Sequence, residues 1–449
     1  MSTDRLVEIT LNLIQGAVGS NTVGIPAIIT NEAPASGFGS GYAKLYKTNE
    51  LSTVGTDFST GGVTYAAAQK LTSPSPKVNQ FYVIKRGATT AGVVTLTFAA
   101  GLGAGDVITG TVNGNAISVT YATSVAATLT ALAAAIQALT EVTTAASNGT
   151  DTITITFAAE WTPAVGTFTA AGGGEPVITT ATVTPAVNIA NDIDNALAET
   201  ATNLWFMLLP TQSDTSVILA AAAKIESLSE YKMMGATSTA TGIYDSGSTT
   251  DVASIMESNG YNRSFINYHD DSTEYIHTII ASRCLSVAPG QVAFKHKRLT
   301  GATPAPLTGA QISIVEGKKC NTYTQAGPFA LFLQGVVSSG VSIEAIRDIF
   351  YFLQELQLAL YNVLVTRDKV PYNESGRQLG LAAGNGVVQR MITEGVLNPD
   401  ADPQNEFIMT EIADISETDR GNHVFPSEVV GEHLASATKF RVIMNIKVS

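Results

Sequence analysis

The chain has 449 residues, of which 25 are Lys or Arg and 38 are Asp or Glu, giving a formal net charge of −13. This acidic balance argues against a nucleic-acid binder, which needs clustered basic residues to displace counterions. No run approaches the ~18 apolar residues that span a bilayer, and residues 1–5 do not resemble the start of a secretion signal. The charged fraction of 14% is below the usual ~25% and indicates a protein that buries much of its surface against neighbours.

The length predicts about three domains. We expect a multidomain α+β protein with an α/β core, an inserted small β-rich domain, a C-terminal α+β domain and extended terminal arms. In chain order the expected parts are an arm at 1–20, a discontinuous α/β domain at 21–87 and 187–300, an insert at 88–186, a C-terminal domain at 301–436 and an arm at 437–449.

The first expected element is an amphipathic strand in the N-terminal arm. Val7, Ile9, Leu11 and Leu13 alternate there with polar residues, which is the two-residue period of a half-buried strand. Such a strand can pair within its own subunit or with the sheet edge of a neighbour, and the pattern leaves both possibilities open.

The composition changes sharply after Arg86. The 137 residues 87–223 contain neither Lys nor Arg, which indicates an inserted domain. Alternating patterns predict strands at 93–98 and 152–157. Asn113-Gly114, between two further strand patterns, predicts a tight hairpin over 107–121. The spacing of apolar residues in 124–139 predicts one helix, so we expect a small mixed sheet covered by that helix.

The segment after the insert alternates between strand and helix patterns. This rhythm predicts an α/β unit with parallel strands. The expected strands are 203–209, 232–236 and 263–268, and the expected helices are 213–231, 249–258 and 272–284.

The last third contains the strongest helical pattern in the chain. An apolar stripe over 342–367 predicts a long amphipathic helix with Ser342 as its N-cap. A helix at 376–393 and a strand at 406–412 should follow. The C-terminal arm repeats the strand pattern of the N-terminal one, with Phe440, Val442, Met444 and Ile446 on one face.

The sequence offers no constellation that predicts catalysis, so we expect a protein that is not an enzyme and has no cofactor or metal. Cys284 and Cys320 lack the spacing of a metal site or a disulfide framework. His269-Asp270-Asp271 stands between a strand and a helix and is interpreted as a turn with a helix start. No motif joins a nucleophile, a base and an orienting group.

Several segments, in this order, are similar to known motifs: Val23–Ile29; Val292–Lys295 followed by Leu299–Pro304; and Asn321–Tyr323, Gly335 and Ile346–Asp348. With these segments the sequence resembles the contractile tail sheath proteins of myovirus-type bacteriophages. The resemblance covers residues 1–86 and 190–449, and the insert matches the habit of sheath proteins of carrying a variable surface domain. Ala293 stands where the family commonly has an aromatic residue.

The resemblance implies a virion structural protein that assembles in the host cytoplasm into the phage tail. Its subunits would form hexameric rings around the tail tube. The strands at Leu6–Ile14 and Lys439–Val448 would each pair with a sheet in the C-terminal domain of an adjacent subunit. Contraction would drive the tube through the host envelope for genome ejection. The implied partners are the chain itself, the tail tube protein, the baseplate and the tail terminator, without nucleic acid or membrane insertion.

Family analogy also suggests a tube-facing helix that carries Glu344, Arg347 and Asp348. Two other functions stay open from the residues alone. One is a static surface-layer or adhesion protein, which the Thr- and Ala-rich insert would suit. The other is a hydrolase with an unrecognised site.

Overall fold

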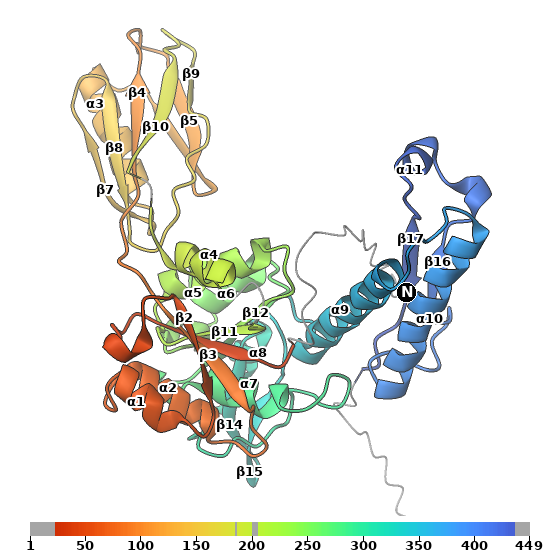
Figure 1. Cartoon of the computed structure of the whole chain (residues 1–449). Helices are drawn as coiled ribbons and strands as arrows, with labels where there is room; N and C mark the ends of the chain where they lie inside the picture. The colour runs from red at the N-terminus through yellow and green to blue at the C-terminus, as the bar shows by residue number, and fades with distance from the viewer. Residues whose placement is uncertain (1–22, 185, 200–204, 436–449) are drawn as a thin grey trace, which may run out of the picture. The chain divides into compact units, whose positions relative to one another are not determined.

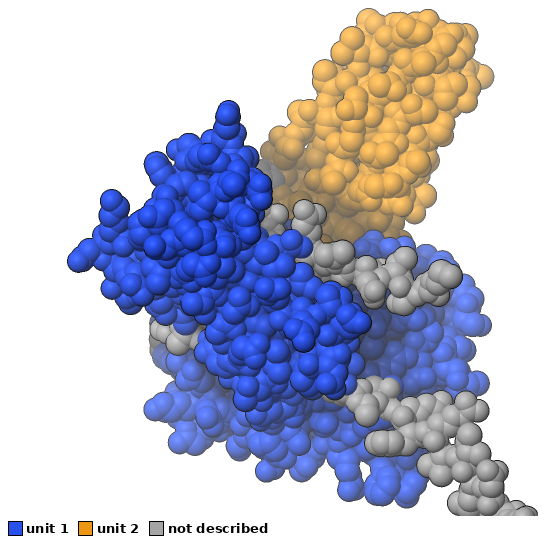
Figure 2. Space-filling view, turned by 90° about the vertical axis from the view of Figure 1, so that its right-hand side faces the viewer, with its two compact units in different colours: residues 1–83, 199–213, 225–449 blue, residues 84–198, 214–224 orange. Residues whose placement is uncertain are grey.

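The computed structural model describes residues 23–184, 186–199 and 205–435, so the predicted arm strands at both ends of the chain lie outside the described residues. The chain divides into two compact units, which Figure 2 colours separately. Unit 1 comprises residues 1–83, 199–213 and 225–449, and unit 2 comprises residues 84–198 and 214–224. The predicted insert, 88–186, therefore falls inside unit 2.

Unit 1 is built on an eight-stranded sheet with the order β15-β14-β13-β12-β11-β1-β3-β2 (Figure 1). The strands are β1 (Pro26–Thr30), β2 (Ala43–Lys47), β3 (Gln80–Lys85), β11 (Met207–Pro210), β12 (Met233–Ser238), β13 (Ser264–Tyr268), β14 (Asn321–Ala326) and β15 (Phe329–Leu333). From β1 through β11, β12 and β13 to β14 every pairing is parallel, and β15 closes the series antiparallel to β14. The predicted parallel order of the three strands after the insert is confirmed.

Helices connect and cover the strands of this sheet. Within unit 1 these are α1 (Leu51–Asp57), α2 (Val63–Thr72), α6 (Val252–Ser258), α7 (Ile276–Leu285) and α8 (Gly309–Gly317). Helix α7 packs against β11, β12, β13 and β1, and α2 packs beside it. β11, β12 and β13 are buried along their whole length, as expected for parallel strands that are covered on both faces, and their sequences do not alternate between apolar and polar residues.

Helices α9 (Ile343–Val365) and α10 (Glu374–Glu394) run side by side in the last part of unit 1 (Figure 1). A two-stranded antiparallel sheet, β16 (Glu406–Met409) and β17 (Ser427–Val430), packs on α10, and α11 (Glu417–Gly421) lies between these strands in sequence. Phe350, Leu356, Val388 and Phe407 join the same apolar core as the large sheet. The long helix was predicted at 342–367 and is confirmed.

Unit 2 contains two antiparallel sheets and a packed helix, α3 (Val125–Gln137). One sheet has the order β10-β4-β8-β7 and the other β6-β5-β9. The strands are β4 (Val93–Phe98), β5 (Val107–Val112), β6 (Asn115–Thr120), β7 (Val142–Ser147), β8 (Thr152–Phe157), β9 (Thr169–Ala171) and β10 (Ile178–Thr184). Helices α4 (Ile189–Glu199) and α5 (Thr215–Ser227) lie largely in this unit.

The expectation of a mixed sheet in the insert was wrong, because all neighbouring strands of these two sheets pair antiparallel. Short turns join β5 to β6 and β7 to β8 and reverse the chain there, whereas a parallel pair would need a long crossover. The hairpin itself is confirmed: β5 and β6 pair around Asn113 and Gly114, whose φ angles of 47° and 82° are those that a type I′ turn requires.

A buried ion-pair cluster lies where the chain enters and leaves the insert. The Arg86 guanidinium pairs with the carboxylates of Glu160 and Asp192, with Nε 3.2 Å from Asp192 Oδ2. The N–H groups of Gly87 and Ile189 donate to the same two carboxylates. Arg86 thus compensates two buried negative charges at the edge of a long segment that has no other cation.

Candidate functional site: the junction at the start of helix α9

Helix α9 begins at a tight turn that follows the β14–β15 hairpin. Gly335 has a φ of +69°, and the N–H of Ile343 donates to its carbonyl oxygen at 2.9 Å. Ser342 occupies the predicted N-cap position with an extended backbone, although its side chain makes no cap hydrogen bond. The turn therefore positions the first two turns of α9, which carry Glu344, Arg347 and Asp348.

Arg347 is buried, with a residue exposure of 1%, and its guanidinium donates only to main-chain carbonyls. Nε donates to Val23 O at 3.1 Å, Nη1 to Cys284 O at 3.2 Å, and Nη2 to Leu285 O at 3.5 Å and to Val287 O at 2.7 Å. The last turn of a helix leaves carbonyls without intrahelical partners and carries partial negative charge. Arg347 therefore caps the C-terminal end of α7 and holds Val23 at the same time.

Asp348 binds two further segments. Its Oδ1 accepts a hydrogen bond from the Gly290 N–H at 2.9 Å, and its Oδ2 lies 3.1 Å from His433 Nε2. Asp348 is 3% exposed. The side chains of Arg347 and Asp348, adjacent in sequence, thus connect α9 with Val23, the end of α7, Gly290 and His433.

Glu344 completes this cluster. Its Oε2 accepts a hydrogen bond from the Phe294 N–H at 3.2 Å. Burial raises the pKa of the Glu344 carboxyl above its ordinary value, and the neighbouring Asp348 carboxylate adds to this effect. Burial also lowers the pKa of Arg347 to about 10, which still leaves the guanidinium charged at neutral pH.

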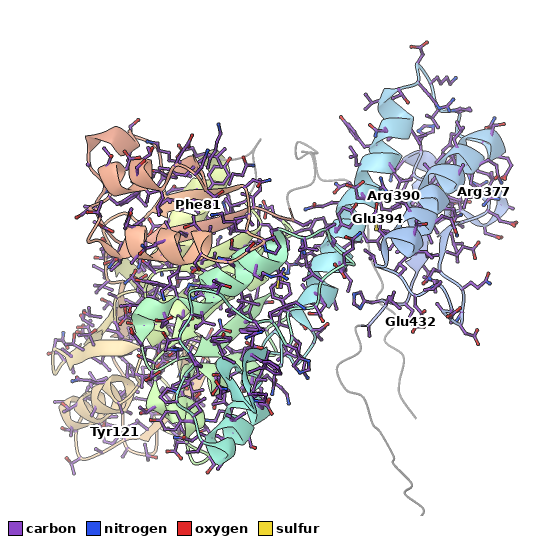
Figure 3. All side chains as sticks on the ribbon, turned by 90° about the horizontal axis from the view of Figure 1, so that it is seen from below. Phe81, Tyr121, Arg377, Arg390, Glu394 and Glu432 are labelled. Carbon is purple, nitrogen blue, oxygen red and sulfur yellow. The ribbon has the colours of Figure 1, made fainter. Side chains whose placement is uncertain are left out.

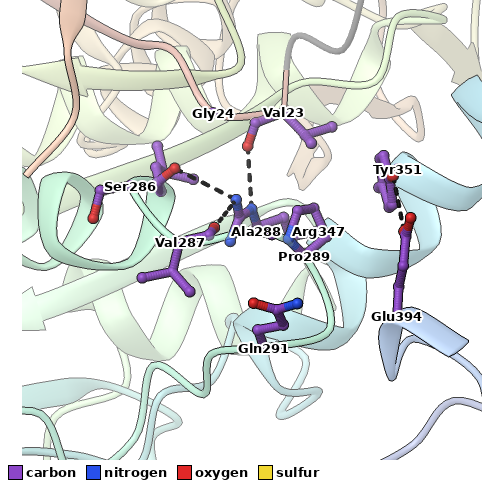
Figure 4. Close-up of a pocket in the computed structure, with 11 residues that line it drawn as sticks. Val23, Gly24, Ser286, Val287, Ala288, Pro289, Gln291, Arg347, Tyr351 and Glu394 are labelled. Atoms are coloured by element: carbon purple, nitrogen blue, oxygen red, sulfur yellow. Dashed lines mark hydrogen bonds between the residues drawn. The ribbon is translucent and has the colours of Figure 1, made fainter. Parts of the chain in front are cut away.

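A pocket of about 420 Å³ borders the junction (Figure 4). Gly24, Pro289 and Gln291 form part of its lining, together with Tyr351 and Glu394 from α9 and α10. The Tyr351 hydroxyl donates to Glu394 Oε2 at 2.9 Å, and burial with this hydrogen bond raises the pKa of Tyr351 to about 12. The Glu394 side chain lies on α10, one turn from Arg390, whose guanidinium contacts Glu355 of α9 at 2.6 Å (Figure 3).

The three side chains predicted to face the tube are instead turned into unit 1. Glu344, Arg347 and Asp348 are 5%, 1% and 3% exposed, and their polar atoms bind groups of the same chain. A charged residue on a helix is ordinarily assumed to face solvent, but here main-chain N–H and C=O groups supply its partners. These side chains are therefore not available to a partner in the described subunit. That α9 as a whole faces the tube stays a prediction.

The junction brings together segments that are far apart in the sequence. Val23, Phe294 and Arg347 each belong to one of the three segments that carry the resemblance. The Arg347 side chain on α9 donates to the Val23 carbonyl, and the Phe294 N–H donates to Glu344 on the same helix. Sequence reasoning did not predict His433, which stands in a polar, weakly patterned segment. No local signal marks it, because its partner is 85 residues away.

The two edges of the small sheet β16–β17 differ. In an antiparallel pair of strands, residues alternately direct their N–H and C=O groups towards the partner strand and away from it. The hydrogen bond from Thr410 N to Pro426 O at 3.0 Å shows which residues face the partner, so Phe407 and Met409 direct their main-chain groups away from β17. The Asn385 side chain on α10 accepts from Phe407 N at 2.9 Å and donates to Phe407 O at 3.1 Å. Arg377, labelled on α10 in Figure 3, donates to Met409 O at 2.9 Å. The outer edge of β16 is thus closed by side chains.

The outer edge of β17 has no such cover. The same alternation directs the main-chain N–H and C=O groups of Ser427 and Val429 away from β16, and they have no hydrogen-bond partner among the described residues. An edge with unpaired main-chain groups can accept another strand. The described part of the chain therefore offers an open sheet edge a short distance in sequence from the C-terminal arm.

The residues considered for chemistry form no site in the described part of the chain. Cys284 and Cys320 are buried and unpaired with each other. Asp271 accepts from the Thr273 N–H at 2.8 Å as the N-cap of a short 3₁₀ helix, which confirms the predicted turn and helix start at 269–271. No group of three or more His, Cys, Asp or Glu side chains that could hold a metal ion occurs in 23–184, 186–199 and 205–435. Within these ranges no helix is both long and apolar enough for a membrane span.

No family model and no curated protein matches the sequence. The structure, in contrast, is similar over its full length to solved chains of contractile particles. One is a chain in the baseplate of the anti-feeding prophage, with a TM-score of 0.51, 10% identity and 100% of both chains covered. Another belongs to the contracted sheath complex of the extracellular contractile injection system PVC, with a TM-score of 0.51, 8% identity and coverage of 99% of this chain and 98% of that chain.

A third similar structure is the helical sheath of the anti-feeding prophage in its contracted state, with a TM-score of 0.51, 10% identity and 99% of both chains covered. Sequence identity this low supports a shared fold and nothing finer. The α+β fold class predicted from the sequence is confirmed, and so is the resemblance to sheath proteins at the level of the fold. The described part of the chain has the fold of the sheath proteins of contractile injection systems.

Proposed function

We propose that this chain is a structural, non-enzymatic subunit of a contractile tail sheath. It would polymerise with itself as hexameric rings stacked around a tail tube, between a baseplate and a terminator, and its contraction would drive the tube through the host envelope for genome ejection. The observation that carries this proposal is the fold match to sheath assemblies, which covers at least 98% of each chain in the two contracted-state structures.

The way in which subunits would be joined follows from the open edge of β17. A sheet of two strands is marginally stable alone, and an added strand would supply the hydrogen bonds that Ser427 and Val429 lack. Both arms carry strand patterns, with Val7, Ile9, Leu11 and Leu13 in one and Phe440, Val442, Met444 and Ile446 in the other. We infer that arms of neighbouring subunits add strands on the β17 side.

The first test is electron microscopy of the purified full-length chain. A sheath subunit should form hollow tubes of stacked rings, whereas flat lattices would favour a static surface layer. A chain that stays monomeric under all assembly conditions would contradict the proposal.

Removing residues 1–15 or 438–449 tests donation by the arms. Either truncation should leave a folded subunit that forms no tubes, and normal tubes from either one would refute donation by that arm.

The second test addresses the acceptor edge with a matched pair of variants. Val429→Pro removes an N–H that points away from β16, so it costs no bond of the β16–β17 ladder but blocks a strand that arrives at β17. Val429→Ala shortens the side chain and keeps the N–H. We expect tubes from the Ala variant and none from the Pro variant, with similar melting temperatures of the monomers. Equal assembly of both variants would exclude the β17 edge.

A further inference from the structure

The junction at α9 lies at the roots of both arms. We call Val23–Ile25 the N-terminal root and residues 432–434 the C-terminal root, because residues 1–22 and 436–449 continue from them. The Ile25 carbonyl oxygen accepts from the Phe206 N–H, and β1 begins at the next residue. The Val23 carbonyl, two residues farther out, is held by the Arg347 side chain.

The C-terminal root is held in a comparable way. The Asn398 N–H donates to Glu432 O at 2.8 Å, and the Leu434 N–H donates to Val396 O at 3.0 Å, so the root forms a short ladder with the segment that follows α10. The His433 side chain then connects this ladder to α9 through Asp348 Oδ2. A side chain of α9 therefore binds each root: Arg347 binds the N-terminal root at Val23, and Asp348 binds the C-terminal root at His433.

The two holding residues are neighbours in one turn of a 23-residue helix. A helical turn is stiff, since every residue in it is fixed by main-chain hydrogen bonds. Arg347 is further fixed by the carbonyls at the end of α7, and Asp348 by the Gly290 N–H. Gly290 has a φ of +75°, and a Cβ at this position would lie only 2.6 Å from Glu394 O. The end of α10 therefore packs closely against the segment that Asp348 binds.

We propose that Arg347 and Asp348 form a shared anchor that fixes the positions from which the two arms leave the subunit relative to each other. Its role in assembly rests on the proposed function. A subunit that donates two strands needs both to start at a constant separation, because every subunit of a regular lattice must reach its neighbours in the same way. A fixed root also raises the effective concentration of an arm at the acceptor edge, since it shortens the free part of the tether.

Hydrogen exchange of the full-length monomer tests the anchor without reference to assembly. The decisive variant is His433→Ala, because His433 is only partly buried and its removal leaves the core intact. We expect the amide of Leu434, which donates to Val396 O, to exchange about tenfold faster, as a lost hydrogen bond to a charged group allows. His433→Gln keeps an N–H donor for Asp348 and should restore most of the protection. Unchanged exchange in the Ala variant would overturn the proposal.

The N-terminal hold is tested by Arg347→Lys, which keeps the charge but has too few donors in the right positions to replace the guanidinium. Faster exchange in the peptide that covers residues 23–30 is expected, and wild-type exchange there would refute the role of Arg347. Should this buried substitution prevent folding, the pair of His433 variants still decides the proposal.

Assembly provides the second readout. The critical concentration for tube formation should rise about tenfold in His433→Ala and return towards the wild-type value in His433→Gln. His296→Asn is the control, because His296 is exposed and has a φ of +61° that Asn tolerates. If wild-type protein forms no tubes, the proposed function fails while hydrogen exchange still tests the anchor. If the Ala variant assembles like wild type, the anchor fails and the proposed function stands.

Discussion

Unit 2 and unit 1 use buried charge differently. The core of unit 2 is made of apolar side chains such as Leu96, Leu129 and Ile155, and its buried ion pairs gather around Arg86 where the chain enters and leaves the insert. Its other buried carboxylate, that of Asp106, accepts only from main-chain N–H groups of the insert itself. Unit 1 buries charged or titratable side chains within its fold, among them Arg347 and Lys232. Buried charges need specific partners, so they fix which segments meet, whereas apolar packing tolerates exchange. We infer from this difference that the core of the insert forms from residues of the insert alone, and that unit 1 would carry the connections that the proposed assembly needs.

The two units can be observed separately, because the chain has two tryptophans and they lie in different units. Trp161 packs against the core of unit 2, and Trp205 is fully buried in unit 1. In a Trp205→Phe background fluorescence reports unit 2, and in a Trp161→Phe background it reports unit 1.

The largest effect is expected from Arg86→Met. This substitution leaves the buried carboxylates of Glu160 and Asp192 without their cation, which should reduce the free energy of unfolding of unit 2 by about 3–5 kcal/mol. Urea unfolding followed by Trp161 fluorescence measures it. The control is Lys224→Met, which breaks a more exposed ion pair with Asp194 and should cost less than about 1 kcal/mol. Equal losses in the free energy of unfolding for the two variants would show that burial of the Arg86 cluster does not increase its contribution to the stability of unit 2.

The next effect compares the two cores. Ile155→Ala in unit 2 and Leu356→Ala in unit 1 each truncate a side chain with 0% exposure and should cost about 2–5 kcal/mol. If the insert folds around itself, Ile155→Ala shifts the Trp161 transition and leaves the Trp205 transition in place, and Leu356→Ala does the reverse. A common shift of both transitions by either variant would mean that the units unfold together.

A smaller effect concerns the pH dependence of unit 1. The Lys232 ammonium donates to Trp205 O and lies 4.7 Å from the centre of the Trp205 ring system, and burial lowers its pKa from 10.5 to about 7. Above pH 7 the unfolded chain holds a proton that the folded chain has lost, so the Lys232 contribution to stability rises with pH until about 10.5. The melting temperatures of wild type and Lys232→Met should therefore diverge between about pH 7 and 9.5, because the wild type gains stability relative to the variant as the pH rises. Parallel curves would contradict the lowered pKa.

The smallest effect is expected on the acid side, from His277. Its Nε2 donates to Pro210 O at 3.0 Å and its Nδ1 lies 2.8 Å from Thr237 Oγ1, and burial lowers its pKa from 6.5 to about 3. Below pH 6.5 His277 is protonated in the unfolded chain but stays neutral in the folded chain, so stability falls as the pH drops towards 3. His277→Gln should flatten the curve of unit 1 in this range, and the Trp161 signal of unit 2 should not change. A curve as steep as that of wild type would assign the acid sensitivity to other groups.

Patterns within short windows of the sequence predicted much of the secondary structure. The helix expected at 342–367 is α9 at Ile343–Val365, and the strand expected at 152–157 is β8. The turn at Asn113-Gly114 and the parallel strands after the insert were also predicted. The β14–β15 hairpin and β17 were not, because polar residues such as Thr322 and Glu428 interrupt their apolar patterns. Such elements form where neighbouring strands offer hydrogen bonds, and a local window contains no information about those neighbours.

The periodicity of the main helices, the tight turns and the abrupt loss of basic residues after Arg86 are visible in the amino-acid sequence, because propensity, turn geometry and composition act over a few residues. The inward orientation of Arg347 and Asp348 and their contacts with Val23 and His433 arise from packing between distant segments. Val23 is 324 residues away from Arg347 in the chain. A charged side chain on a helix is exposed by default, and it becomes buried only when distant main-chain groups replace the water that it loses.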